Sequence, residues 1–239
     1  MATGGPPKVI DSHLHVWASP QQKSTHTFRV RSPHCRVMLE FLLECMGEAG
    51  VNGALIVQPI NHKFDHSYVT SVLKQYPSKF VGCCLANPAE DGNGDGYRGV
   101  RFNPYLWPSG QLAMFAKAGE LGVPVGFMCM KGLLLHLPEI EQLCTEFPST
   151  IVLLDHMGFC KPPLYPYPYE DLSGILSKVV SSYGANRIMW GSDFPYVVSE
   201  CGYKEAKEAA HQLIQRASLS SSELEWIMGR TVCQIFNNW

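Results

Sequence analysis

The sequence predicts an α/β fold with parallel strands, and a (β/α)8 barrel is its favoured form. Short β-branched and apolar runs alternate with segments of helical periodicity, and strands joined by helices pair in parallel. The phrases EAGVNGALIV, QYPSKFVGC, ELGVPVGFM and SYGANRIMW share one order: a helix end, a Gly or Pro, then a buried strand. A doubly wound sheet is the alternative, but no G-x-G-x-x-G motif follows the first strand.

The strand pattern is one short of the eight strands that a closed barrel requires. The gap lies after the sixth strand, where PPLYPYPYED leaves too little chain for a helix and a strand. The third crossover, PAEDGNGDGYR, is also too short for a helix. The sequence therefore predicts an incomplete barrel, with strands at Lys8–Ser12, Gly53–Gln58, Phe80–Leu85, Gly99–Asn103, Pro124–Cys129, Thr150–Asp155 and Arg187–Trp190.

Helical periodicity fills most of the intervals between these strands, as crossover connections require. The last helix has the sequence of a capping box, with Ser222 followed three residues later by Glu225. The helices are expected at Val37–Ala49, His66–Tyr76, Leu112–Leu121, Pro138–Phe147, Tyr169–Tyr183, Tyr203–Ala217 and Ser222–Phe236.

Composition predicts one domain over residues 1–239 and excludes several classes of partner. A net charge of −2 provides no basic surface, so we expect no nucleic-acid partner. The amino terminus has no apolar signal region, and the most apolar stretch contains Lys131 and His136, so we expect no membrane partner. The nine cysteines are scattered without a C-x-x-C motif, which suits reduced thiols and a cytoplasmic location.

Polar residues gather at the predicted carboxyl ends of the strands, where parallel barrels carry their active sites. His13 and His15 in KVIDSHLHVW lie on one face of the first strand, because strand side chains alternate. Burial of two adjacent imidazoles costs free energy unless they bind a ligand or a hydrogen-bonding partner. A convergent set of His, Asp and Arg from different strands is typical of a hydrolytic site. The set comprises Asp11, His13, His15, Gln58, His62, Asp65, Arg101, Asn103, Asp155, His156, Ser192 and Asp193.

At these residues the chain resembles the amidohydrolase superfamily. The resemblance is to its amidohydrolase-related branch of lactonases and decarboxylases, which includes pyrone-dicarboxylate lactonase and sugar lactonases. IDSHLHVW, GVRFNP, LLDHMG and WGSDFP carry the resemblance, in this order, and it runs from about residue 8 to the carboxyl terminus. It implies a (β/α)8 barrel.

The resemblance also implies a role for each site residue. Asp193 would be the general base that takes a proton from the attacking water. His13, His15 and His156 would either bind one divalent metal, zinc or manganese, with Asp193, or polarise the substrate carbonyl without metal. Arg101 would hold a substrate carboxylate, although pairing with a neighbouring carboxylate is the alternative. Gln58, His62 and Asn103 would contribute to substrate binding.

The favoured activity is a lactonase that opens a small acidic cyclic ester. A zinc-dependent decarboxylase of an unsaturated dicarboxylic acid is the first alternative. The second is an inactive barrel remnant, because a helix and a strand of the family pattern are missing and residues 24–38 fit that pattern poorly. Both departures suggest a mis-spliced or mispredicted gene product. We expect a small carboxylated molecule as the partner, and the sequence leaves the oligomeric state open.

Overall fold

The computed structural model describes residues 6–18, 38–85, 96–103, 111–159 and 165–239. Most of the anomalous segment 24–38, most of the third crossover and residues 160–164 of the gap lie outside these described residues. Among the described residues, no helix is both long and apolar enough to cross a membrane.

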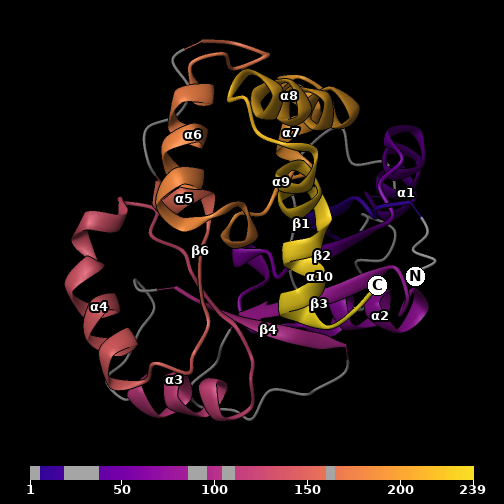
Figure 1. Ribbon diagram of the computed structural model, residues 1–239. Helices are drawn as coiled ribbons and strands as arrows, with labels where there is room; N and C mark the ends of the chain where they lie inside the picture. Colours follow the sequence, from indigo (N-terminus) through magenta and orange to yellow (C-terminus); the bar gives the residue numbers. More distant parts are fainter. Residues whose placement is uncertain (1–5, 19–37, 86–95, 104–110, 160–164) are drawn as a thin grey trace, which may run out of the picture. The chain divides into compact units, whose positions relative to one another are not determined.

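Six parallel strands are hydrogen-bonded in the order of the sequence, as in a (β/α)8 barrel that lacks strands. This strand order confirms the predicted fold class, and Figure 1 shows the helices that connect the strands. Six of the predicted strands are present with ends shifted by a few residues at most. The strands are β1 (Ile10–Leu14), β2 (Gly53–Val57), β3 (Phe80–Leu85), β4 (Tyr97–Phe102), β5 (Val125–Phe127) and β6 (Val152–Leu154).

The predicted helices are all present, and the last of them is divided by a π-helical turn at Trp226–Arg230. Two short helical segments, α5 (His156–Phe159) and α7 (Tyr196–Glu200), were not predicted. Met157 and Gly158 inside α5 have positive φ, so that segment is a tight turn and not a regular helix. The helices are α1 (Met38–Ala49), α2 (Ser67–Gln75), α3 (Gln111–Glu120), α4 (Leu137–Glu146), α5 (His156–Phe159), α6 (Leu172–Tyr183), α7 (Tyr196–Glu200), α8 (Tyr203–Arg216), α9 (Ser221–Glu225) and α10 (Thr231–Phe236).

The predicted capping box at Ser222 and Glu225 is wrong by two residues. The Ser220 hydroxyl accepts a hydrogen bond from the Glu223 N–H, and the Glu223 carboxylate accepts one from the Ser220 N–H at 2.7 Å. The run SSSELE contains two overlapping S-x-x-E patterns. The pattern alone does not select between them, and the helix begins at the first.

The chain divides into two compact units, and each is described by itself. Unit 1 comprises residues 1–56, 76–80 and 163–239, and unit 2 comprises residues 57–75 and 81–162. The prediction of one domain stays a prediction.

In unit 1, β1 lies between β2 and the extended segment 188–194. The Ser12 N–H donates to the Trp190 carbonyl at 2.9 Å, and the His15 N–H donates to the Phe194 carbonyl at 2.8 Å. Leu14 and Phe194 form a parallel bridge. The predicted strand Arg187–Trp190 is therefore wrong as a regular strand, although residues 188–194 run parallel to β1. The Trp190 N–H donates to the Ile227 carbonyl, so it is not available for a sheet ladder.

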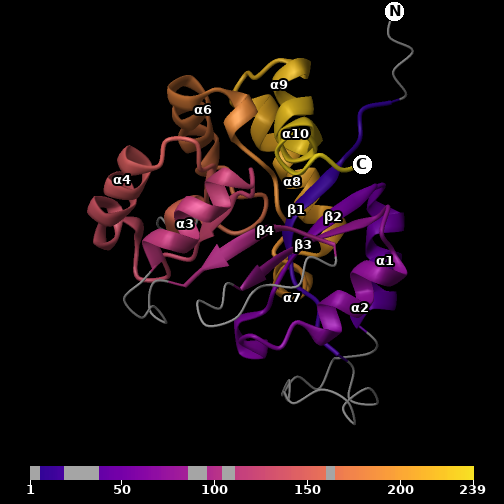
Figure 2. The same ribbon diagram turned by 90° about the horizontal axis from the view of Figure 1, so that it is seen from below.

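The carboxyl-terminal helices of unit 1 support the start of β1. The π-helical turn and α10 both contact β1, as Figure 2 shows for α10. Gly229 makes this contact possible, because a Cβ atom there would lie 2.0 Å from the Lys8 carbonyl oxygen. In the same unit, α8 packs against both α1 and α6.

Unit 2 contains the consecutive strands β3, β4, β5 and β6, together with α3 and α4. Its core forms between the strands and these helices, around Phe102, Phe115 and Phe127. β5 is fully buried, whereas β6, the last strand of the sheet order, is only partly buried and Leu154 is exposed. β6 therefore has the character of an edge strand.

Candidate active site

Two histidines of β1 are the starting point of the candidate site in unit 1. His13 and His15 lie two residues apart, so the strand places both on one face. Their rings meet edge to face with centroids 5.1 Å apart, and His15 is buried. Their Nε2 atoms therefore lie close enough to act on one group.

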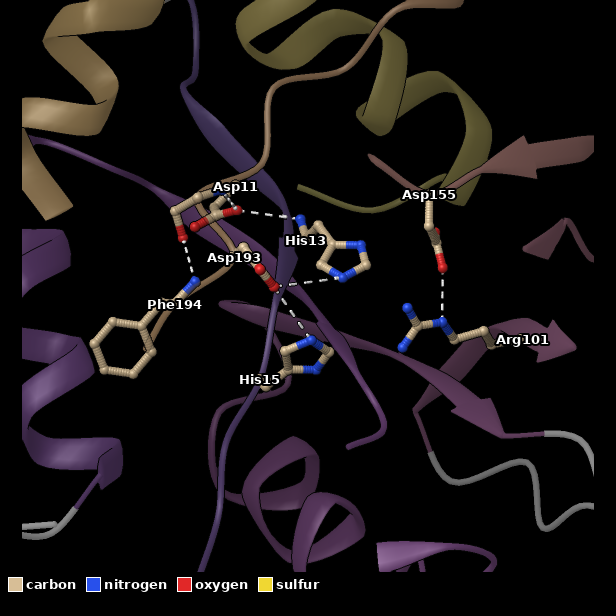
Figure 3. Close-up of polar contacts among 8 residues, drawn as sticks. Asp11, His13, His15, Arg101, Asp155, Asp193 and Phe194 are labelled. Atoms are coloured by element: carbon tan, nitrogen blue, oxygen red, sulfur yellow. Dashed lines mark hydrogen bonds and ion pairs between the residues drawn. The ribbon is translucent and has the colours of Figure 1, made fainter. Parts of the chain in front are cut away.

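Asp193 in the segment beside β1 faces both of these histidines (Figure 3). Its Oδ1 atom lies 3.9 Å from His13 Nε2 and 3.4 Å from His15 Nε2. Asp193 has a φ of 57°, in the left-handed region that non-glycine residues rarely adopt. Its N–H donates to the His13 carbonyl and its carbonyl accepts from the Tyr196 N–H, so backbone hydrogen bonds on both sides hold this conformation.

Gly191 allows the segment with Asp193 to approach β1 closely. A Cβ atom at Gly191 would lie 2.7 Å from His13 Cβ and 3.0 Å from His13 N, closer than real Cβ contacts. The small residue in the WGSDFP motif is thus required by the short distance between the two backbones.

Asp11 connects the same two segments through its buried carboxylate. Oδ1 accepts hydrogen bonds from the N–H groups of His13, at 3.1 Å, and Ser192, at 3.0 Å. Oδ2 accepts a hydrogen bond from the Tyr203 hydroxyl of α8 at 2.9 Å. Burial raises the pKa of Asp11 to about 6, although hydrogen bonds from Ser192, His13 and Tyr203 act in the opposite direction.

Two aromatic residues flank the histidine pair. The His15 ring contacts Trp17 and Tyr196, with centroids 5.7 Å and 6.3 Å away, and Trp17 also contacts Tyr196. Trp17 is buried and Tyr196 is exposed. Burial, together with the negative charge of Asp193, raises the pKa of the Tyr196 hydroxyl, so this phenol is neutral near pH 7.

The other predicted site residues belong to unit 2. Gln58, His62, Arg101 and Asn103 are all buried there. The Gln58 side-chain amide donates to the backbone carbonyls of Lys63, at 3.4 Å, and Asp65, at 2.8 Å, so it supports the turn after β2. His156 follows β6 with a φ of 51°, and its ring contacts Phe159.

Arg101 of β4 forms a buried ion pair with Asp155, which follows β6. Arg101 Nε donates to Asp155 Oδ2 at 2.6 Å. Figure 3 shows this contact between the two side chains. Arg101 therefore pairs with a neighbouring carboxylate, which is the alternative that the sequence left open.

The donor atoms of unit 1 fit a divalent metal. Two imidazole nitrogens and a carboxylate oxygen are ligand types that zinc accepts at about 2.0–2.2 Å. Ligands at that distance in tetrahedral geometry are separated by roughly 3.4 Å, close to the 3.4 and 3.9 Å between Asp193 Oδ1 and the two Nε2 atoms. Asp193 could therefore share one ion with His13.

The structure thus brings His13, His15 and Asp193 together within unit 1. Gln58, His62, Arg101, Asn103 and His156 lie in unit 2. Sequence reasoning missed Tyr203 as a partner of Asp11 and left the partner of Arg101 unnamed. A signal existed for Asp155, which directly precedes His156 in the motif LLDHMG. No local signal marks Tyr203, because it is far from Asp11 in the sequence.

Comparison with known proteins relates this chain to the amidohydrolases. The family model described as Amidohydrolase matches residues 10–231. No curated protein matches the chain. Among solved structures, the chain is similar to a probable 2-pyrone-4,6-dicarboxylic acid hydrolase from Acinetobacter baumannii that was crystallised with citric acid. The TM-score is 0.74 at 19% identity, and 96% of this chain and 99% of the other are covered.

Two further structures share the fold at lower identity. An amidohydrolase from Burkholderia multivorans with bound zinc has a TM-score of 0.74 at 14% identity, with 97% and 100% of the two chains covered. A lactonase from Listeria monocytogenes has a TM-score of 0.63 at 10% identity, with 96% and 93% covered. At these identities the likeness shows the fold.

Proposed function

Because the chain belongs to the amidohydrolase family, we propose that it is a lactonase that opens a small acidic cyclic ester. The family establishes the broader class, a hydrolase. Two structural neighbours support the narrower activity: one is described as a pyrone-dicarboxylic acid hydrolase and the other as a lactonase. The bound citric acid of the first neighbour supports an acidic substrate.

The observation that carries this proposal is the contact between Asp193 and the histidines of β1. A carboxylate 3.4 Å and 3.9 Å from two imidazoles can accept a proton from a water molecule that lies between them. The left-handed backbone at Asp193 and the close approach at Gly191 direct the carboxylate to this position.

Each residue then has a defined task. Asp193 accepts the proton of the attacking water and returns it to the leaving alkoxide of the opened ring. His13 and His15 orient the carbonyl of the ester, and the exposed ring of Tyr196 contacts the substrate ring. For His156 and Arg101 of unit 2, the roles predicted from the sequence, carbonyl activation and carboxylate binding, stay predictions.

The same donor set suits zinc or manganese. The chemistry that a divalent metal would supply here is Lewis-acid polarisation of the ester carbonyl. As predicted from the sequence, His13, His15, His156 and Asp193 would hold the ion. The metal-free alternative assigns carbonyl polarisation to the imidazoles themselves.

The experiment is a hydrolysis assay with the full chain and 2-pyrone-4,6-dicarboxylate, a sugar lactone and a neutral lactone, with and without added Zn²⁺ or Mn²⁺. We expect ring opening of the acidic ester, measured as proton release. Turnover of the neutral lactone alone would contradict the acidic substrate. Release of CO₂ from an unsaturated dicarboxylic acid, without lactone hydrolysis, would favour the decarboxylase instead. A folded, monodisperse chain without turnover on any substrate would favour the inactive remnant.

A further inference from the structure

The buried carboxylate of Asp11 joins three parts of unit 1 that are distant in the sequence. It accepts hydrogen bonds from β1 through His13, from the segment beside β1 through Ser192, and from α8 through Tyr203. Asp11 is fully buried, and a buried carboxylate persists only when its oxygens are hydrogen-bonded. None of the tasks proposed for the reaction uses this group.

Two of the three donors to Asp11 belong to the reacting groups or lie next to them in the sequence. His13 is itself one of the two histidines, and Ser192 directly precedes Asp193. The Ser192 hydroxyl also accepts the Phe194 N–H at 3.0 Å, so the residues on both sides of Asp193 are held. Asp193 keeps a left-handed conformation that costs of order 1–3 kcal/mol and persists only when its surroundings determine it.

We propose that the Asp11–Tyr203 pair is a positioning device that sets the Asp193 carboxylate against His13 and His15. This inference rests on the proposed function for its kinetic consequence but not for its structural one. Asp11 fixes the two backbone segments, and the Tyr203 hydroxyl fixes the rotamer of Asp11 by binding Oδ2. Tyr203 also packs against Trp190 and Phe194, so α8 holds the segment from its outer side.

The variant Tyr203→Phe tests this arrangement because it removes one hydroxyl and keeps the packing of the ring. We expect kcat to fall about tenfold, the effect of losing one hydrogen bond to a charged group, with KM changed less than twofold. The control is Lys207→Met on the same helix. It removes the hydrogen bond from Lys207 Nζ to the Ala49 carbonyl, which links α8 to α1 and involves none of the groups that bind Asp11.

A second pair of variants separates positioning from general stability. Both backbone N–H groups bind the same oxygen, Oδ1. Asp11→Asn can keep this oxygen and offer its amide to the Tyr203 oxygen, so it should retain most of the turnover. Asp11→Ala removes all three hydrogen bonds, and we expect kcat to fall at least a hundredfold. Equal kcat for the Asn and Ala variants would overturn the proposal.

A readout that needs no activity keeps this test independent of the proposed function. The NMR ring resonances of His13 and His15 report on the Asp193 carboxylate. The Asp193→Asn variant shows how far these resonances shift when the carboxylate charge is removed. In Tyr203→Phe these resonances should move away from the wild-type positions, whereas in Lys207→Met they should stay. Unchanged resonances and kcat in Tyr203→Phe, or equal changes in both variants, would overturn the positioning role. If the wild-type chain opens no lactone, the histidine ring resonances alone test the positioning role.

Discussion

Arg101 and Asp155 form an ion pair across the strand that separates them. Arg101 lies on β4 and Asp155 follows β6, and Gly126 of β5 pairs with Arg101 in the register. A Cβ atom at Gly126 would lie 3.7 Å from Asp155 Oδ1 and 3.8 Å from Arg101 Cγ. Both are ordinary van der Waals distances, so the two charged groups meet at 2.6 Å directly over Gly126.

Removal of one partner of this pair should strongly destabilise unit 2. Arg101 and Asp155 are 4% and 11% exposed, and breaking a buried ion pair typically costs about 3–5 kcal/mol because the remaining charge is unpaired. We therefore expect Asp155→Ala to lower the free energy of unfolding by about this amount in urea titrations. The double variant Arg101→Met with Asp155→Leu should recover most of the loss. A single variant as stable as the wild type would show that the pair is solvated.

Asp193→Asn should remove the proposed base while keeping the shape of the side chain. The expected loss in kcat is about 10²–10⁴-fold, the usual contribution of a general base, and KM should change little. Glu120→Gln is the control, because this exposed carboxylate of α3 pairs with Lys117 at the surface. Near-wild-type turnover by Asp193→Asn would refute the role of the base.

Gly191→Ala should damage both stability and the site. The added methyl group would lie 2.7 Å from His13 Cβ, and overpacking of this kind costs about 1–3 kcal/mol. We expect a lower melting temperature and a displaced Asp193. The matched control is Gly174→Ala in α6, where a Cβ atom meets nothing within 4 Å. That variant should be as stable as the wild type or more stable, by up to about 1 kcal/mol, and a loss of equal size in both would contradict the steric argument.

The sequence predicted the part of the site that local motifs encode. His13 and His15 were found because strand alternation places them on one face, and Asp193 because its motif follows in the expected order. The partners of Asp11 and Arg101 could not be found in this way. Tyr203 is 192 residues from Asp11 and Asp155 is 54 residues from Arg101, so only the folded backbone brings them together.

The fold was predicted best where the hydrophobic pattern was unambiguous. β3 has the predicted bounds, because an apolar run lies between clear helix and loop signals. The region Arg187–Trp190 was predicted as a strand from the same kind of run. Its 3-10 turn at Ala185–Arg187 and the hydrogen bond from the Trp190 N–H to Ile227 depend on tertiary contacts that no local pattern contains.

The capping box at Ser220 should make the stability of the last helices depend on pH. Hydrogen bonds from the Ser220 N–H and hydroxyl lower the pKa of Glu223 below its ordinary 4.5. A lowered pKa in the folded state means that this stabilisation is complete above the unfolded pKa and is lost as the pH falls through the folded pKa. The difference in unfolding free energy between the wild type and Glu223→Gln should therefore shrink below about pH 4.5. A difference that stays constant down to pH 3 would contradict the cap.

The partly buried β6 should make this chain prone to association. Its neighbour β5 is fully buried, whereas Ile151 and Leu154 are 38% and 42% exposed. In a closed barrel a further strand would cover this edge, and among the described residues β6 is the last strand in the sheet order. Apolar strand edges that lack a neighbour pair with other chains, so we expect the chain to aggregate at high concentration.

Two changes should reduce this association. Leu154→Lys places a charge on the edge, which is how natural proteins protect such strands, and light scattering should then fall. Leu121→Lys is the control, because Leu121 is exposed directly after α3 and belongs to no strand. The second change restores a strand and its helix after Pro163, which should increase solubility and thermal stability together. Equal solubility of the original chain and both altered chains would show that the edge of β6 is not the source of association.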